Sequence, residues 1–313
     1  MKYTHIARYV AETPWAILQS KLEEIEAILA FHMSGGKFTE QELRARVGAG
    51  ATPAALRLEA AAGATAGPGG AIAVIPVRGV IAHRMGSLQE MSGGTSTERL
   101  AGLLRQAAND PNVGSILLDV NSPGGTVAGV TELAAEIRAI AKQKPVTAHV
   151  NALAASAAFW AISGATEIVS TPSGEVGSIG VITAHVDTSK ADEQEGVTRT
   201  VISAGKYKAE GAGPLTEDAR AAIQARVDDF YATMTADIAE GRGVSVAEVR
   251  SGFGEGRVVG AAAAVKMGMI DRVATFDETL RSMTGRRRSP SVRAEDETAM
   301  MVEADRGRRM RLA

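Results

Sequence analysis

The sequence predicts an α/β fold, because short strand-like runs alternate with helix-like stretches along its middle. SILLDV (115–120) and PVTAHV (145–150) are short and apolar on both faces, as buried parallel strands are. A helix-like stretch at 130–141 separates them, and an apolar helix follows the second run. Strand, helix, strand and helix in this order are typical of a layered α/β fold with right-handed crossovers.

Composition excludes several classes of site. The 313 residues carry a formal net charge of -2, with 45% hydrophobic and 22% charged residues, so no overall field demands nucleic acid or a membrane. The chain has no cysteine, which excludes disulfides, thiolate nucleophiles and cysteine zinc sites and agrees with a cytoplasmic location. No two histidines have metal-ligand spacing, and we expect neither a metal nor a cofactor.

The chain divides into four parts by composition. We expect a helical extension over 1–60, a flexible linker over 61–70, a main domain over 71–280 and a polar, flexible tail over 281–313. The extension contains an amphipathic helical stretch at 15–31. Acidic residues lie among the arginines of the tail, so nucleic-acid binding is not expected.

Further elements of the main domain are expected in order. AIAVIPVRGVI at 71–81 predicts a strand in which Pro76 marks an edge or a bend. TSTE at 95–98 fits a capping box that begins a helix. We expect two short strands, EIVS at 167–170 and IGVIT at 179–183. A long amphipathic helix is expected from 216 to about 240.

Two loops after the buried strands could carry chemistry. In NSPGG (121–125), adjacent glycines let backbone N–H groups point at a polarised oxygen, with Gly125 the favoured donor; the alternative is a simple turn. In NALAASAAFW (151–160), a helix is expected to begin near Ala155. The Ser156 hydroxyl at its positive end is then either a nucleophile or a helix N-cap.

A serine nucleophile needs a neighbouring base, and the sequence offers two kinds. His185 is the best-placed histidine, with Asp187 two residues later. In GKYK, an extended chain would place Lys206 and Lys208 on one side and Tyr207 on the other. A lysine acts as a base only when burial keeps it uncharged, and the alternative is a solvated surface lysine.

Taken together, the motifs resemble the signal peptide peptidase A family of serine peptidases, within the fold group of the Clp protease proteolytic subunit and crotonase. The similarity runs from 71 to about 279. It is carried by IAVIPVRGVI, ILLDVNSPGG, ALAASAAFWAI, GEVGSIGVI, SAGKYKAEG, AEGRGVS and GRVVGAAAAVKMGMID. The resemblance implies a layered fold of repeated β-β-α units, with the N-terminal helical extension and the polar tail outside it.

The resemblance also implies roles for individual residues. It places the nucleophile of a Ser/Lys dyad on Ser156 and its base on Lys208. The backbone N–H groups of Gly125 and Ala157 would form the oxyanion hole, and the Ser178 hydroxyl would hold the lysine. Alanines follow Ser156 where the family commonly has glycines.

The extension and the tail resemble those of phage and prophage minor capsid, or prohead, proteases. We therefore expect a serine endopeptidase that processes scaffold or capsid proteins during head assembly, in the host cytoplasm or inside an immature capsid. We expect a homo-oligomer without a membrane anchor. Three alternatives are a catalytically silent scaffold or capsid-assembly protein of the same fold, a Clp-like Ser/His/Asp peptidase using His185, and a crotonase-like acyl-CoA enzyme.

Overall fold

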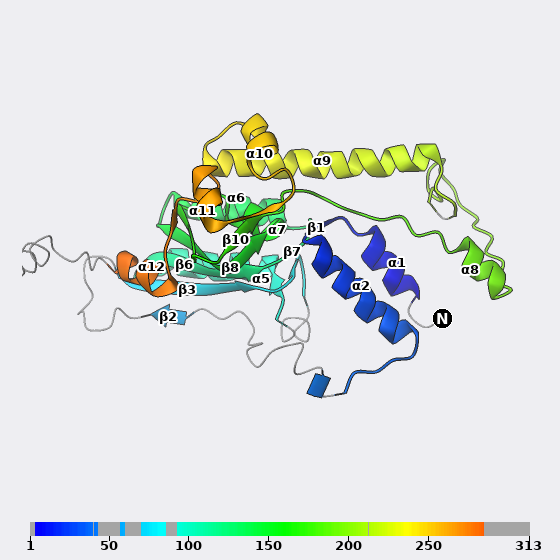
Figure 1. Ribbon diagram of the computed structural model, residues 1–313, viewed down its shortest axis with the longest axis horizontal. Helices are drawn as coiled ribbons and strands as arrows, with labels where there is room; N and C mark the ends of the chain where they lie inside the picture. Colours follow the sequence, from blue (N-terminus) through cyan, green and yellow to red (C-terminus); the bar gives the residue numbers. More distant parts are fainter. Residues whose placement is uncertain are drawn as a thin grey trace, which may run out of the picture.

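The computed structural model describes residues 4–39, 41–42, 57–59, 70–85, 93–211 and 213–284. In this part of the chain two β-sheets are surrounded by helices (Figure 1). The larger sheet contains β2 (Arg57–Glu59), β3 (Ala71–Arg78), β6 (Val113–Ser122), β8 (Val146–Ala155), β9 (Glu167–Ser170), β10 (Glu175–Gly177), β11 (Val258–Gly260) and β12 (Arg272–Val273). The smaller sheet contains β1 (Trp15–Ile17), β4 (Ile81–Ala82), β5 (Thr95–Ser96) and β7 (Gly124–Thr126).

The helices described are α1 (Thr4–Glu12), α2 (Gln19–Met33), α5 (Thr97–Asn109), α6 (Val130–Ala141), α7 (Ala157–Ile162), α8 (Ser189–Gln194), α9 (Glu217–Arg242), α10 (Val246–Gly252), α11 (Ala261–Lys266) and α12 (Phe276–Met283). None of them is long and apolar enough to cross a membrane. The linker expected at 61–70, apart from residue 70, and residues 285–313 of the expected tail lie outside the described residues.

The chain is built from β-β-α units, as the family resemblance implies. In the first unit β3 enters the large sheet, β4 and β5 enter the small sheet, and α5 follows. In the second unit β6, β7 and α6 repeat this order. The strands β3, β6 and β8 pair in parallel at the centre of the large sheet. The predicted layered α/β fold is confirmed.

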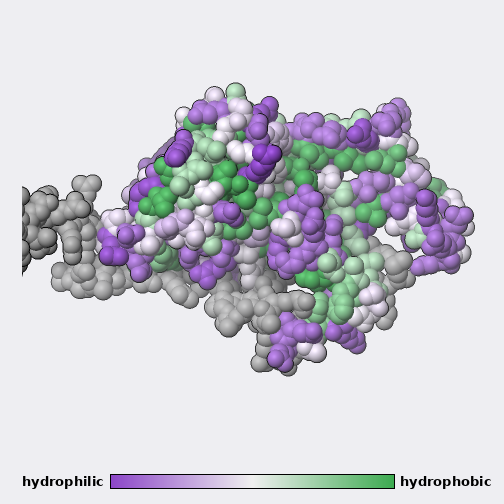
Figure 2. All heavy atoms as spheres, viewed as in Figure 1, coloured by the Kyte–Doolittle hydropathy of each residue, from purple (hydrophilic) through white to green (hydrophobic). Residues whose placement is uncertain are grey.

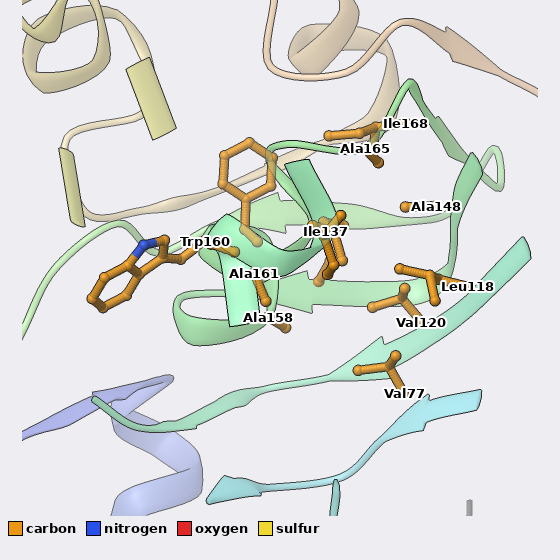
Figure 3. Packing of buried hydrophobic residues seen from close by; sticks show 14 of the residues in the cluster. Val77, Leu118, Val120, Ile137, Ala148, Ala158, Trp160, Ala161, Ala165 and Ile168 are labelled. Carbon is orange, nitrogen blue, oxygen red and sulfur yellow. The ribbon is translucent and has the colours of Figure 1, made fainter. Parts of the chain in front are cut away.

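The large sheet is covered on both faces because its strands are apolar on both faces. On one face, Val77, Leu118 and Val120 are buried together with residues of α5, α6, α7 and α9. Figure 3 shows this layer, with Ala158 and Ala161 of α7 near the strand residues. On the other face, α12 packs against Ile72, Val74 and Leu117. Alternate residues of β3 therefore serve opposite faces.

A buried polar cluster fixes α6, α7 and α9 relative to one another. Asp237 of α9 accepts a hydrogen bond from the Trp160 indole N–H of α7 at 2.8 Å. The same carboxylate forms an ion pair with Arg138 of α6 at 3.2 Å, and both side chains are less than 15% exposed. Close contact of α9 with the end of α7 also needs Gly241, because a Cβ there would lie 2.7 Å from the Ser163 carbonyl. The helix layer behind the site is therefore rigidly connected.

Four expectations about local structure are wrong. The helix expected from 15 begins only at Gln19, because Trp15–Ile17 pairs as a strand with β7. The helix after TSTE is capped by Ser96, since the Thr95 hydroxyl donates to the Arg78 carbonyl instead. The segment 179–183 is irregular apart from one bridge at Ile182, and the strand β10 lies before it, at Glu175–Gly177. The helix expected near Ala155 begins at Ala157, because β8 continues through Ala155.

Other elements agree with the sequence. The strands at 115–120 and 167–170 and the helix at 130–141 are present, the last with the expected bounds. The long helix α9 begins after Thr216, whose hydroxyl caps it. Pro76 lies on β3 beyond Val74, the last residue of β3 that pairs with β2 among the described residues.

Candidate active site

Ser156 stands on a strained turn between β8 and α7. Its backbone has φ 53° and ψ -116°, a conformation that non-glycine residues rarely adopt. Its N–H donates to the Gly177 carbonyl at 2.6 Å, and its own carbonyl accepts from the Trp160 N–H at 2.9 Å. Ser156 occupies the N-cap position of α7, but its side chain makes no capping hydrogen bond, so the hydroxyl is not used to cap the helix. A serine held on a sharp strand-to-helix turn is instead typical of a nucleophile.

An irregularity in β8 creates this turn. Val120 of β6 pairs with Val150, but Ser122 pairs with Ala154, so β8 carries two extra residues between these positions. Within this bulge Ala152 has φ 91°. The first half of β8 pairs with β9 and the end of β8 pairs with β10. The bulge therefore moves the end of β8 to a new neighbour and delivers Ser156 next to β10.

The NSPGG loop lies next to this turn. Gly124 has φ 98°, and a Cβ at Gly124 would lie 2.9 Å from the Ala155 carbonyl and would collide with the Ala16 carbonyl. At Gly125 a Cβ would collide with the Ile81 carbonyl of β4. Only glycine fits at either position, because two other backbones approach the loop from opposite sides. The structure thus brings the predicted oxyanion loop beside the residue that precedes Ser156.

Two further predicted residues lie at the same turn. Ala157 is the first residue of α7, so its N–H has no acceptor within the helix. Ser178 follows β10, with φ 53° and its N–H bonded to the Arg257 carbonyl at 2.8 Å. Its neighbours contact Ser156 directly, since the Ser156 hydroxyl donates to the Gly180 carbonyl at 3.4 Å. The predicted set of Ser156, Gly125, Ala157 and Ser178 is therefore gathered around one turn.

Lys208 is not gathered there within one chain. It lies on a segment that we call the arm, residues 186–216, which includes α8 and reaches beyond the sheets to the N-terminal end of α9 (Figure 1). The Lys208 side chain is exposed, and no hydrogen bond joins it to Ser156. The segment is turned rather than extended as expected, and the Lys206 ammonium lies 4.7 Å from the centre of the Tyr207 ring.

His185 is also separate from the serine. Its Nε2 lies 3.0 Å from the Gly213 carbonyl. Asp187 bonds to Ser189, and this hydroxyl bond is the main reason that the pKa of Asp187 is lowered. Neither contact forms a Ser/His/Asp relay with Ser156. The geometry of one chain therefore gives no support to His185 as the base.

His149 has a structural environment. It is fully buried in β8, its Nδ1 lies 3.1 Å from the Thr279 hydroxyl, and its ring packs edge-on against Phe276. Its Nε2 is buried with no hydrogen-bond partner. Burial lowers the pKa of His149, with the nearby Asp119 carboxylate opposing this and Arg272 adding to it. This histidine joins α12 to the sheet on the face opposite α7.

Comparison with protein families identifies the segment that contains the serine. The model of peptidase family S49 matches residues 138–288, a range that includes Ser156, Ser178 and Lys208. Residues 138–288 are therefore similar in sequence to peptidase family S49. The predicted resemblance to signal peptide peptidase A-like serine peptidases is confirmed. Gly125 lies before the matched range, and it is connected to this site through Gly124, whose Cβ position lies 2.9 Å from the Ala155 carbonyl.

Relatives of two kinds are similar to this chain. The chain is 34% identical over 197 residues to the head-tail preconnector protein GP5 of Enterobacteria phage P21, covering 59% of this chain and 39% of that protein. It is 34% identical over 214 residues to the capsid assembly protease C of Escherichia phage lambda, covering 68% of this chain and 48% of that protein. A putative signal peptide peptidase SppA of Enterococcus faecium is 29% identical over 184 residues, covering 58% of this chain and 53% of that protein.

The chain spans less than half the length of both phage relatives. Among solved structures, a point mutant of ClpP1 from Listeria monocytogenes matches 65% of this chain and 92% of its own chain, with a TM-score of 0.42 and 15% identity.

The sequence did not reveal one feature of the site. β1 lies antiparallel to β7, directly beside the NSPGG loop, with Ala16 opposite Gly125. The signal available was weak, since WAIL after a proline is an apolar run of only four residues that also fits the start of an amphipathic helix.

Proposed function

We propose that this protein is a serine endopeptidase in which Ser156 is the nucleophile and Lys208 is the base. The observation that carries the proposal is the strained Ser156 turn beside the glycine loop, within a segment of peptidase family S49. Backbone strain of this kind costs on the order of 1–3 kcal/mol, and it persists where function selects for it.

The proposed chemistry is acyl transfer. The uncharged amine of Lys208 takes the proton of the Ser156 hydroxyl as the oxygen attacks a peptide carbonyl. The N–H groups of Gly125 and Ala157 donate to the oxyanion, and the lysine then gives the proton to the leaving amine. Water hydrolyses the resulting ester and restores the serine. Ser178 would hold the lysine amine in place.

The arm leads us to propose a homo-oligomer in which one copy supplies Lys208 to the Ser156 of its neighbour. The arm carries apolar side chains in water, with Val201 57%, Ile202 94% and Tyr207 58% exposed. Figure 2 also shows an apolar band along α9 below its hydrophilic upper edge. Ile223 and Val227 of α9 are only half-buried. Docking against a second copy would cover both and remove the lysine amine from water.

The substrates proposed are scaffold or capsid polypeptides during phage head assembly, inside the bacterial host. Support comes from the similarity to the two phage relatives, one a capsid assembly protease and the other a head-tail preconnector protein.

A serine-directed fluorophosphonate probe tests the nucleophile. We expect labelling of the intact protein on Ser156 and none of Ser156→Ala, with product maps by mass spectrometry showing peptide cleavage only for the former. Absence of labelling in an assembled sample would favour the second candidate function, a catalytically silent scaffold. The observation that supports this candidate is that Lys208 is exposed and not bonded to Ser156. Thioester hydrolysis that persists in Ser156→Ala would favour the acyl-CoA enzyme.

Paired base variants test the dyad. Lys208→Ala is expected to lower peptide hydrolysis at least about 1,000-fold, because a triad or dyad acts as a unit. His185→Ala is the matched control and should keep most activity; the reverse result would move the base to histidine.

Complementation tests whether sites are shared between copies. Ser156→Ala and Lys208→Ala are each expected to be inactive, but an equal mixture should regain about a quarter of the sites, since one copy in two supplies each group at an interface between copies. No recovery after joint refolding would place both groups in one chain.

A further inference from the structure

The N-terminal strand β1 occupies the space beside the glycine loop in the manner of a bound peptide. It is flanked on both sides: β7 pairs with it antiparallel, and the Trp15 N–H and carbonyl bond to Ile182 at 2.8 and 2.9 Å. Trp15, Ala16 and Ile17 are 7%, 0% and 4% exposed. β1 is thus held by backbone bonds to a strand on one side and to a single bridge residue on the other, and backbone pairing of an extended segment with a strand is a usual way in which a protein binds a peptide.

The register places one carbonyl of β1 at the proposed oxyanion donor. The Val127 N–H donates to the Pro14 carbonyl at 3.2 Å, and the Leu18 N–H donates to the Pro123 carbonyl at 2.9 Å. Every second pair along an antiparallel ladder is hydrogen-bonded, and the pair between these two is Ala16 with Gly125. The Gly125 N–H therefore points at the Ala16 carbonyl.

The same peptide bond lies next to the serine turn. A Cβ added to Gly124 would collide with the Ala16 carbonyl and lie 3.1 Å from the Ile17 Cα. It would also lie 2.9 Å from the carbonyl of Ala155, the residue before Ser156, so Gly124 lies between β1 and the serine turn. The strand is anchored at both ends, since the Trp15 indole N–H bonds to the Val10 carbonyl at 2.7 Å and the Leu18 N–H bonds to the Pro123 carbonyl at 2.9 Å.

We propose that β1 lies in the enzyme's own peptide-binding groove with the Ala16–Ile17 bond at the cleavage position, so that it competes with other substrates. This inference rests on the proposed function. Attack of Ser156 Oγ on the Ala16 carbonyl carbon would break the bond to the Ile17 nitrogen, which leaves as an amine with the serine proton. Water then releases Ala16 as a carboxylate. The groove accordingly selects an extended chain with a small residue before the cut, because Ala16 is fully buried there.

The first test weakens the strand in the full-length protein. Trp15→Ala removes the anchoring indole, and Ala16→Pro removes the N–H that pairs with β7. Each should raise kcat/KM for dye-labelled casein at least about tenfold, because a groove filled in most molecules lowers apparent affinity by the free fraction. The control is Tyr9→Ala, 73% exposed on α1, which should change nothing. Melting temperature and gel filtration check that all variants are folded and equally assembled.

The second test fixes the register. A synthetic peptide of residues 10–20, VAETPWAILQS, should be cut between Ala16 and Ile17 by the Trp15→Ala enzyme and left intact when Ser156→Ala is added. Casein hydrolysis that is equal in wild type and both strand variants, or cleavage of the peptide at another bond, would overturn the inference while leaving the serine peptidase intact. No hydrolysis by any variant, together with no fluorophosphonate labelling, would instead overturn the proposed function and this inference with it.

Discussion

Gly125→Ala tests the oxyanion hole at the position where the structure is least tolerant. A Cβ at Gly125 would collide with the Ile81 carbonyl oxygen and lie 2.6 Å from the Ile81 nitrogen, whereas unstrained contacts of this kind exceed 3.0 Å. These are backbone atoms of β4, so no side chain can rotate away, and the loop itself must move. The Gly125 N–H then points away from the oxyanion.

Two effects of this change are separable. Loss of one oxyanion donor typically lowers kcat about 100- to 1,000-fold. Overpacking of a tight site costs about 1–3 kcal/mol of stability. Gly102→Ala is the matched control, because a Cβ there meets nothing within 4 Å and the residue lies inside α5. It should leave kcat unchanged and stabilise the helix by about 0.5–1 kcal/mol.

Steady-state hydrolysis and urea unfolding measure the two terms. If Gly125→Ala keeps wild-type kcat, Gly125 is not an oxyanion donor, whatever its effect on stability. If it lowers kcat no more than its loss of folded protein explains, the loop is structural and the donor must be sought elsewhere around Ser156.

Two further predictions concern stability. Asp237→Ala leaves Arg138 buried without its main partner, which should lower the free energy of unfolding by about 3 kcal/mol. The control, Asp228→Ala on the exposed side of the same helix, should change it by less than about 0.5 kcal/mol. Equal effects of the two variants in chemical denaturation would show that the ion pair is not what connects α6 to α9. Burial lowers the pKa of His149 in the folded state, so the unfolded chain binds the proton first as pH falls below about 6.5. The contribution of His149 to stability should therefore be full above that pH and decline below it, with a slope of at most about 1.4 kcal/mol per pH unit. His149→Gln, followed by the same acid titration of Tm, should flatten this decline, and an unchanged profile would assign it to other groups.

The sequence predicted those parts of the fold whose signal is local. The strand at 115–120 and the helix at 130–141 have residues whose apolar periods match their elements, and α9 carries its own cap at Thr216. The family resemblance grouped Ser156, Gly125, Ala157 and Ser178, and the structure places them around one turn, whereas Lys208, which the resemblance also placed there, lies on the arm.

What the sequence could not show depends on pairing between distant segments. The end of β8 is a strand only because a two-residue bulge gives it β10 as a neighbour, and that bulge has no local signature in NALAA. Similarly, Trp15–Ile17 has the composition of a helix start, and only the backbone of the glycine loop makes it a strand. The two glycines of NSPGG were correctly expected to admit a close approach, but the chain's own β1 makes that approach at Gly124.

The buried serine and the filled groove have one explanation. Ser156 is 0% exposed in the single chain, although a nucleophile must meet its substrate. If β1 were a permanent part of the fold, the glycine loop would have no free N–H to offer a substrate and Ser156 would stay covered. The site has its serine and glycine loop in place, but a peptide-like strand covers it and its lysine lies elsewhere. A protease that becomes active only after assembly would need this arrangement. Fluorophosphonate labelling that is slow in the monomer and fast in an assembled protein that has lost β1 would support this order. Equal labelling rates in the monomer, in the assembled protein and in the assembled protein without β1 would contradict it.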